Sequence, residues 1–169
     1  MSVIKHRDQR VGVFIDVANL YHSAKNLYRA KVNFKEVLKT AIAGRHLIRA
    51  MAYSVRTEGG EEQAFVEALT KSGIEVRLKD LQIFPGGMKK GDWDVGLAID
   101  AIKLGAKLDA IVLVTGDGDF APLVEFLKVN FGSQVEVIGF GRSTSGLLKE
   151  VADDFTDLGD NIKKYLINQ

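Results

Sequence analysis

The sequence predicts an α/β protein in which a mainly parallel β-sheet is covered by helices on both faces. Five short apolar runs, each of strand length, alternate with segments of helical periodicity. Runs such as AIVLV at 110–114 are apolar at every position, which is typical of strands that are covered on both faces of a sheet. No repeat, low-complexity tract or long linker interrupts the alternation. We therefore expect one domain with right-handed crossovers.

Each element follows from its own pattern of residues. The strands are predicted at 11–17 (VGVFIDV), 46–55 (HLIRAMAYSV), 74–84 (IEVRLKDLQIF), 109–115 (DAIVLVT) and 134–140 (QVEVIGF). Helices are predicted at 18–31, 33–43, 59–72, 93–106, 119–131 and 144–152. The segment FPGGMKKGDW at 84–93 combines a proline with three glycines and is expected to be a mobile loop.

The domain boundaries follow from the first and last elements. We expect residues 1–10 to be an N-terminal extension and 11–158 to form the domain. Residues 159–169 are predicted to be a C-terminal helix or tail of that domain.

Composition limits the class of protein. The 169 residues are 46% hydrophobic and 27% charged, which suits one well-filled core. The absence of cysteine excludes disulfides, a thiol nucleophile and a thiolate zinc site, and it favours a reducing, cytoplasmic location. The longest apolar runs have strand length, so we expect no membrane association.

The net charge of +1 is unevenly divided along the chain. Residues 1–56 contain eleven Lys and Arg against three Asp and Glu, whereas residues 57–169 contain twelve against nineteen. A basic surface beside an acidic one suits a polyanionic partner that is processed at metal-binding carboxylates. Ordinary solvated helix faces would give the same counts.

Several carboxylates occupy the ends of predicted strands. Asp16 ends the first strand, and Asp117 and Asp119 follow the fourth within VTGDGDF. In a parallel sheet, ligands bind at the carboxyl ends of the strands, where the strand order reverses. If the first and fourth strands are neighbours, these side chains converge. Asp94 begins the helix WDVGLAID and is expected at the same rim.

These four aspartates predict a metal site. Like charges this close destabilise one another unless a cation joins them. Oxygen ligands, no cysteine and three histidines without paired ligand spacing favour Mg²⁺ or Mn²⁺. Such ions activate water for phosphodiester cleavage. Asp100 lies about 120° around the helix and about 9 Å along it from Asp94. We therefore expect it to support the ligands from outside or to form a salt bridge.

Four motifs of the sequence resemble those of a known family. FIDVANL, KKGDWDVGLAIDA, VLVTGDGDFAPLV and VEVIGF, in this order over 11–158, are similar to NYN domains, the LabA-like branch of the PIN-like nuclease superfamily. The resemblance implies a PIN-like Rossmannoid three-layer sandwich with strand order 3-2-1-4-5. It also implies metal-dependent ribonuclease chemistry. The matching motif positions are Asp16, Asn19, Asp94, Asp117 and Asp119.

One motif departs from the family pattern. The commoner spacing is Lys-Gly-x-Asp, but one extra residue separates Lys90 from Asp94 here. Lys90 is therefore expected to sit differently, and Asp92 becomes a substitute ligand or a supporting carboxylate.

Five residues are predicted to contact substrate, and the first three of them have an alternative role: Asn19, Lys90, Thr115, Arg142 and Ser143. Asn19 also suits a helix cap, and Thr115 also suits a hydrogen bond to Asp16. Lys90 also suits a solvated loop. Asp119 is an alternative N-cap for the helix that contains Pro122, and Trp93 suits either base stacking or packing.

The sequence therefore predicts a Mg²⁺- or Mn²⁺-dependent endoribonuclease acting on RNA, with single-stranded RNA as one substrate and a second copy of the chain as a further partner. The first alternative is a regulatory module that binds RNA or nucleotides without cleaving them. The second is a haloacid dehalogenase-type phosphatase. That family needs an acid two residues after its nucleophilic aspartate, and Ala18 occupies that position after Asp16.

Overall fold

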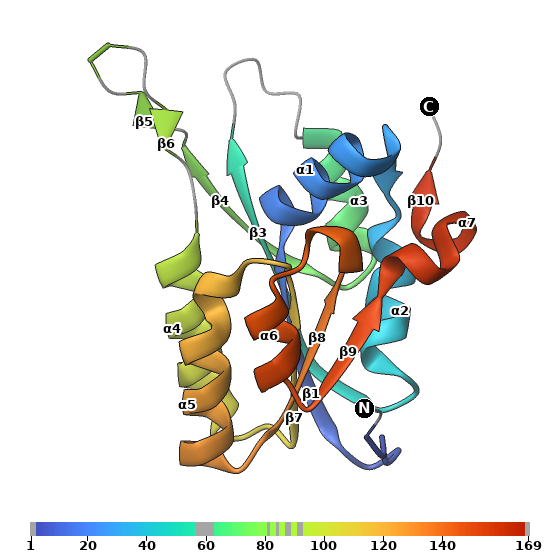
Figure 1. The fold of residues 1–169 in the computed structure, drawn as a ribbon, viewed down its shortest axis with the longest axis vertical. Coiled ribbons are helices and arrows are strands. Elements are labelled where there is room, and N and C mark those ends of the chain that lie inside the picture. Colours follow the sequence, from blue (N-terminus) through green and yellow to red (C-terminus); the bar gives the residue numbers. More distant parts are fainter. Residues whose placement is uncertain are drawn as a thin grey trace.

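A computed structural model describes residues 3–56, 63–80, 82–83, 85–86, 89–90 and 93–167, with only the backbone of 82–83 and 89–90. It has three layers, with a six-stranded sheet between two layers of helices (Figure 1). All five strand pairings in this sheet are parallel. The predicted fold class is confirmed.

The strand order places the first and fourth predicted strands side by side. The strands are β1 (Arg10–Asp16), β3 (His46–Arg56), β4 (Glu75–Asp80), β7 (Ala110–Val114), β8 (Gln134–Gly139) and β9 (Asp154–Asp157). Their order is β4-β3-β1-β7-β8-β9. The five predicted strands therefore follow the order 3-2-1-4-5, and β9 adds a sixth strand beyond β8. The strand order reverses between β1 and β7, so their carboxyl ends are the expected site.

The helices divide into two layers that cover opposite faces of the sheet (Figure 1). One layer contains α1 (Val17–Tyr28), α2 (Phe34–Ile42) and α3 (Gln63–Lys71). The other contains α4 (Asp94–Gly105), α5 (Ala121–Phe131) and α6 (Gly146–Val151). Among the residues described, no helix has both the length and the apolar character needed to cross a membrane.

The layers form because β1 alternates its side chains between two apolar clusters. Val13 and Ile15 pack with α1 and α2, whereas Phe14 packs with α4 and α5. All three are fully buried. Gly12 precedes these three residues, and a Cβ there would require the end of the Leu108 side chain to move. Asp16 follows the same alternation as Phe14, so its side chain belongs to the face that α4 covers.

The shorter elements differ from expectation in two places. The predicted C-terminal helix is limited to α7 (Ile162–Tyr165), because β10 (Leu166–Ile167) then pairs antiparallel with β2 (Lys31–Val32). The predicted loop at 84–93 is described only in part, since 84, 87, 88, 91 and 92 lie outside the described residues. Inside this segment, β6 (Lys89–Lys90) pairs antiparallel with β5 (Gln82–Ile83), which precedes it.

A buried ion pair closes the opposite, amino-terminal edge of the sheet. Arg45, between α2 and β3, has a fully buried side chain, and its guanidinium donates to both carboxylate oxygens of Glu136 at 2.8 and 2.9 Å. Its other three N–H groups donate to Ile42 O, Ala41 O and Gln9 Oε1. All five guanidinium donors are therefore satisfied. Sequence analysis did not identify this pair.

Candidate metal centre

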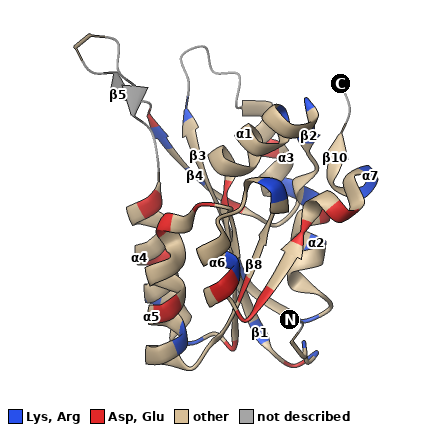
Figure 2. Ribbon diagram, viewed as in Figure 1, with Lys and Arg blue, Asp and Glu red and all other residues tan. Residues whose placement is uncertain are grey.

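Asp16, Asp94 and Asp117 meet at the carboxyl end of the sheet. They come from the end of β1, the first residue of α4 and the loop after β7. Each offers one carboxylate oxygen, and these three oxygens lie within 4.8 Å of one another. All three side chains are partly buried. In Figure 2 the upper end of α4, where Asp94 begins the helix, is drawn red. The convergence follows from the adjacency of β1 and β7.

Hydrogen bonds fix the orientation of Asp16. Its Oδ1 accepts from the backbone N–H of Asn19 at 3.2 Å, which makes Asp16 the N-cap of α1. Its Oδ2 accepts from the hydroxyl of Thr115 at 3.0 Å. That hydroxyl also accepts from the backbone N–H of Asp117 at 3.2 Å. Thr115 therefore links two of the three aspartates.

The burial of Thr115 decides between its two predicted roles. Its side chain is fully buried, which leaves no surface for substrate. The alternative, a hydrogen bond to Asp16, is the one found.

Replacing Thr115 with Val should lower metal affinity about 10- to 100-fold, because an outer hydrogen bond that orients a ligand carboxylate is lost. Calorimetric titration with Mn²⁺ measures the affinity. Thr115→Ser keeps the hydroxyl and should bind Mn²⁺ nearly as well as the wild type. Equal loss in both variants would show that the methyl group matters instead.

Asn19 joins α1 to the loop that carries Asp117. Its Oδ1 accepts from the backbone N–H of Gly116 at 2.8 Å, and the carbonyl of Gly116 accepts from the N–H of Ser145 at 3.0 Å. A Cβ on Gly116 would lie 2.8 Å from the carbonyl oxygen of Ser143, so only glycine fits this approach. The cap of α1 is Asp16, and Asn19 instead positions the loop.

Asp117 and Asp119 differ in their surroundings. Asp117 is the N-cap of a short 3₁₀ helix, η1 (Gly118–Phe120), and its Oδ1 accepts from the N–H of Asp119 at 2.9 Å. Asp119 is exposed and is not part of the three-carboxylate group. It does not cap α5 either, because Phe120 occupies that position without a side-chain hydrogen bond. Its predicted role as a metal ligand stays a prediction.

A comparison with known families shows which family this chain belongs to. A sequence model of the NYN domain matches residues 10–159. This chain belongs to the NYN domain family. Membership, together with the acidic triad, supports a nuclease-type role.

Two other proteins are similar to this chain. The low amplitude and bright protein LabA of Synechococcus elongatus is 26% identical over 168 residues, covering 91% of this chain and 86% of that protein. A crystal structure of a protein of unknown function from Vibrio parahaemolyticus has a TM-score of 0.87 at 31% identity. That alignment covers 98% of this chain and all of the other.

In this NYN domain, Asp100 lies away from the triad. It is buried on α4, accepts a hydrogen bond from the Tyr53 hydroxyl at 2.8 Å and forms an ion pair with Arg77 at 3.3 Å. Of its two predicted roles, the salt bridge is therefore found. Burial, reinforced by the Asp100 hydrogen bond, raises the pKa of Tyr53, so its hydroxyl stays protonated and donates.

The side chain of Trp93 packs against other residues inside the NYN domain. Its Nε1 donates to the carbonyl of Ser54 at 2.9 Å, and its ring lies against Tyr53. A Cβ on Gly96 would come within 2.5 Å of the indole, so that glycine makes room for the ring. The packing alternative is therefore the one found.

The remaining predicted contacts lie on the rim or outside the described residues. Arg142 and Ser143 belong to the 3₁₀ helix η2 (Gly141–Ser143) and are exposed, and the Ser143 hydroxyl donates to Ser23 Oγ at 2.9 Å. Asp92 lies outside the described residues, as does the side chain of Lys90. Substrate contacts by Lys90, Arg142 and Ser143 stay predictions, as does a ligand role for Asp92.

Sequence reasoning did not single out two residues, one beside the NYN triad and one beside Asp100. Ser145 is the N-cap of α6 and donates its N–H to Gly116. A serine before the helical run GLLKEV was the available signal. Arg77, the partner of Asp100, had no local signal, because their contact depends on the packing of β4 near α4.

Proposed function

We propose that this NYN domain is a Mg²⁺- or Mn²⁺-dependent endoribonuclease that hydrolyses RNA phosphodiester bonds. Asp16, Asp94 and Asp117 would hold the ion. The observation that carries the proposal is the approach of their three oxygens to within 4.8 Å, from three separate elements.

The donor set fits a hard divalent ion. All three donors are carboxylate oxygens, the ligands that Mg²⁺ and Mn²⁺ prefer. Given bonds of about 2.1 Å, neighbouring oxygens in an octahedral Mg²⁺ site are about 3.0 Å apart and opposite ones about 4.2 Å apart. Side-chain rotations that bring the three oxygens closer together would complete the ligand set. A shared cation also offsets the repulsion among three like charges.

The chain's own residues would prepare the reaction. The bound ion supplies a more acidic water and stabilises the leaving oxygen. Asp16 is held in one orientation by Thr115 and by the Asn19 N–H, so the orientation of this one carboxylate is set before metal binds. The exposed guanidinium of Arg142 is suited to a backbone phosphate at the rim. Internal cleavage is part of the proposal, and the length of the fragments from end-labelled RNA tests it.

An assay with the wild-type protein tests the proposal. Single-stranded RNA of mixed sequence, labelled at its 5′ end, and DNA of the same sequence are incubated with Mg²⁺, Mn²⁺ or EDTA. We expect internal RNA fragments with metal and intact RNA with EDTA. An absence of cleavage of both polymers under every condition would contradict the proposal. RNA binding without cleavage would instead support the regulatory module.

A phosphomonoester substrate distinguishes the remaining alternative. We expect no release of phosphate from p-nitrophenyl phosphate under conditions that cleave RNA. Phosphate release with a phosphoenzyme trapped on Asp16 would favour the phosphatase.

A further inference from the structure

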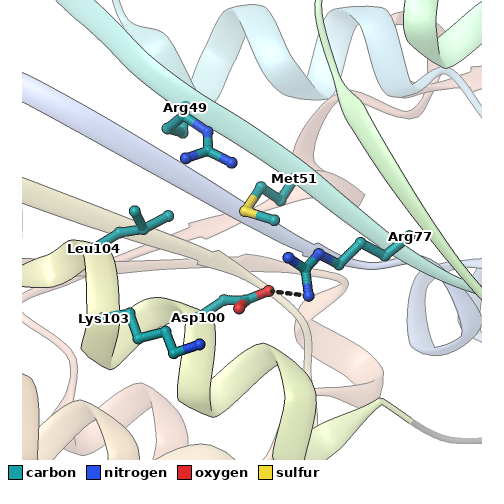
Figure 3. A pocket seen from close by; sticks show the side chains of 6 residues that line it. All are labelled: Arg49, Met51, Arg77, Asp100, Lys103 and Leu104. Atoms are coloured by element: carbon teal, nitrogen blue, oxygen red, sulfur yellow. Dashed lines mark ion pairs between the residues drawn. The ribbon is translucent and has the colours of Figure 1, made fainter.

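A cationic pocket lies beside α4, away from the three aspartates. It has a volume of about 170 Å³ and is lined by Arg49 and Met51 of β3, Arg77 of β4, and Asp100, Lys103 and Leu104 of α4. Figure 3 shows Arg49, Arg77 and Lys103 extending from three elements around a common space. Nothing in the proposed reaction uses these cations.

The charges of this pocket do not cancel. Arg77 pairs with Asp100 at 3.3 Å, yet 49% of the Arg77 side chain is exposed, against 9% of the carboxylate. Arg49 pairs with Glu75, and both side chains are substantially exposed. Among the described residues, none forms an ion pair with Lys103. Three cations face two carboxylates, so the pocket attracts anions.

The size of the pocket favours a small anion. Pockets for whole small molecules measure about 300–1,000 Å³. The volume of about 170 Å³ is below that range. One phosphate group fits such a space, with the apolar side chains of Met51 and Leu104 as further walls. Arginine and lysine are the usual donors to phosphate oxygens.

The pocket lies on the same face of the sheet as the metal centre. Asp16 is paired in register with Tyr53, and Tyr53 with Arg77. These three residues therefore form a row across three neighbouring strands with their side chains on one face. Two strand spacings separate the Cα atoms of Asp16 and Arg77 by about 10 Å. Successive charges on one strand of a duplex are about 3.4 Å apart, so a few nucleotides span this distance.

We propose that this pocket binds a backbone phosphate of the same nucleic-acid strand that is cleaved at the three aspartates. The proposal rests on the proposed function for the nature of its ligand. Lys103 and Arg77 contact the phosphate oxygens, and Asp100 with Tyr53 holds Arg77 in place. The pocket fixes the direction in which the strand crosses the sheet, and its contribution weakens with salt.

Lys103→Glu tests the pocket because Lys103 is exposed and its replacement breaks no ion pair with a described residue. Binding of a fluorescent single-stranded RNA is measured by anisotropy in EDTA, which prevents cleavage, over a range of salt concentrations. We expect Kd to rise about tenfold at low salt, and the slope of log K against log salt to decrease by about 0.7. Lys103→Gln should give a smaller change in the same direction.

Lys71→Glu is the matched control. Lys71 is exposed on α3, in the opposite helix layer and outside the basic segment 1–56, and its replacement changes the net charge by the same amount. We expect its Kd and salt slope to stay close to the wild type. Equal Kd values for wild type and Lys103→Glu would overturn the proposal, as would equal weakening by Lys71→Glu. Failure of the wild type to bind any RNA would also overturn it.

The two proposals can fail separately. If the wild type binds RNA, loses affinity with Lys103→Glu and cleaves nothing with either metal, the pocket stands and the nuclease fails. If the wild type cleaves RNA and Lys103→Glu binds and cleaves it equally well, the nuclease stands and the pocket fails.

Discussion

Asp117→Asn is expected to abolish metal-dependent RNA cleavage, with a loss of more than about 100-fold. Loss of an outer hydrogen bond to a ligand lowers affinity or activity about 10- to 100-fold, and loss of a ligand charge should exceed this. The amide can still accept the N–H of Asp119, so η1 should keep its cap. Cleavage rates at saturating Mn²⁺, together with calorimetric Mn²⁺ titration, measure the effect.

Two further aspartates provide comparisons for Asp117→Asn. Asp8 is exposed and precedes β1, at the opposite edge of the sheet, so Asp8→Asn should leave cleavage unchanged. Asp119→Asn tests the ligand role predicted from the motif, and its exposed position leads us to expect a smaller loss than for Asp117→Asn. Full activity of Asp117→Asn in a folded protein would exclude the proposed centre.

Among these substitutions, Glu136→Gln is expected to lower the free energy of unfolding most, by about 3–5 kcal/mol. The substitution keeps the shape of the side chain but leaves the fully buried cation of Arg45 without its counter-ion. The free energy of unfolding of a domain is about 5–15 kcal/mol, so much of it would be lost. Urea unfolding should show a lower midpoint at an unchanged m-value.

A double variant distinguishes the effect of removing the whole ion pair from the effect of leaving one buried charge unpaired. Arg45→Met combined with Glu136→Met removes both charges and should recover part of the loss. Recovery is incomplete because the carbonyls of Ala41 and Ile42 lose the N–H groups that Arg45 supplies. A loss below about 1 kcal/mol in Glu136→Gln would contradict a stabilising role for the pair.

The carboxylate cluster was predictable because its position depends on strand ends. Asp16 and Asp117 each follow a clear apolar run, and neighbouring parallel strands bring such positions together. Asp94 was identified from its place at the start of a helix. Thr115 had two plausible roles in the sequence, and only its burial decided between them.

Other features depend on contacts that local patterns do not encode. The strand β9 has the sequence DFTD, whose single apolar residue gives no buried run, and it forms because β8 offers an edge. The partner of Asp100 comes from β4, 23 residues earlier in the chain. The pair Arg45 and Glu136 spans 91 positions, so neither residue marks the other in the sequence.

The central place of β1 has a consequence during protein synthesis. The hydroxyl that orients Asp16 belongs to a residue 99 positions later in the chain. A nascent polypeptide therefore carries Asp16 for most of its translation without either partner aspartate beside it. Assembly of the acidic site waits until β7 and the loop after it have emerged from the ribosome, so incomplete chains have no formed centre.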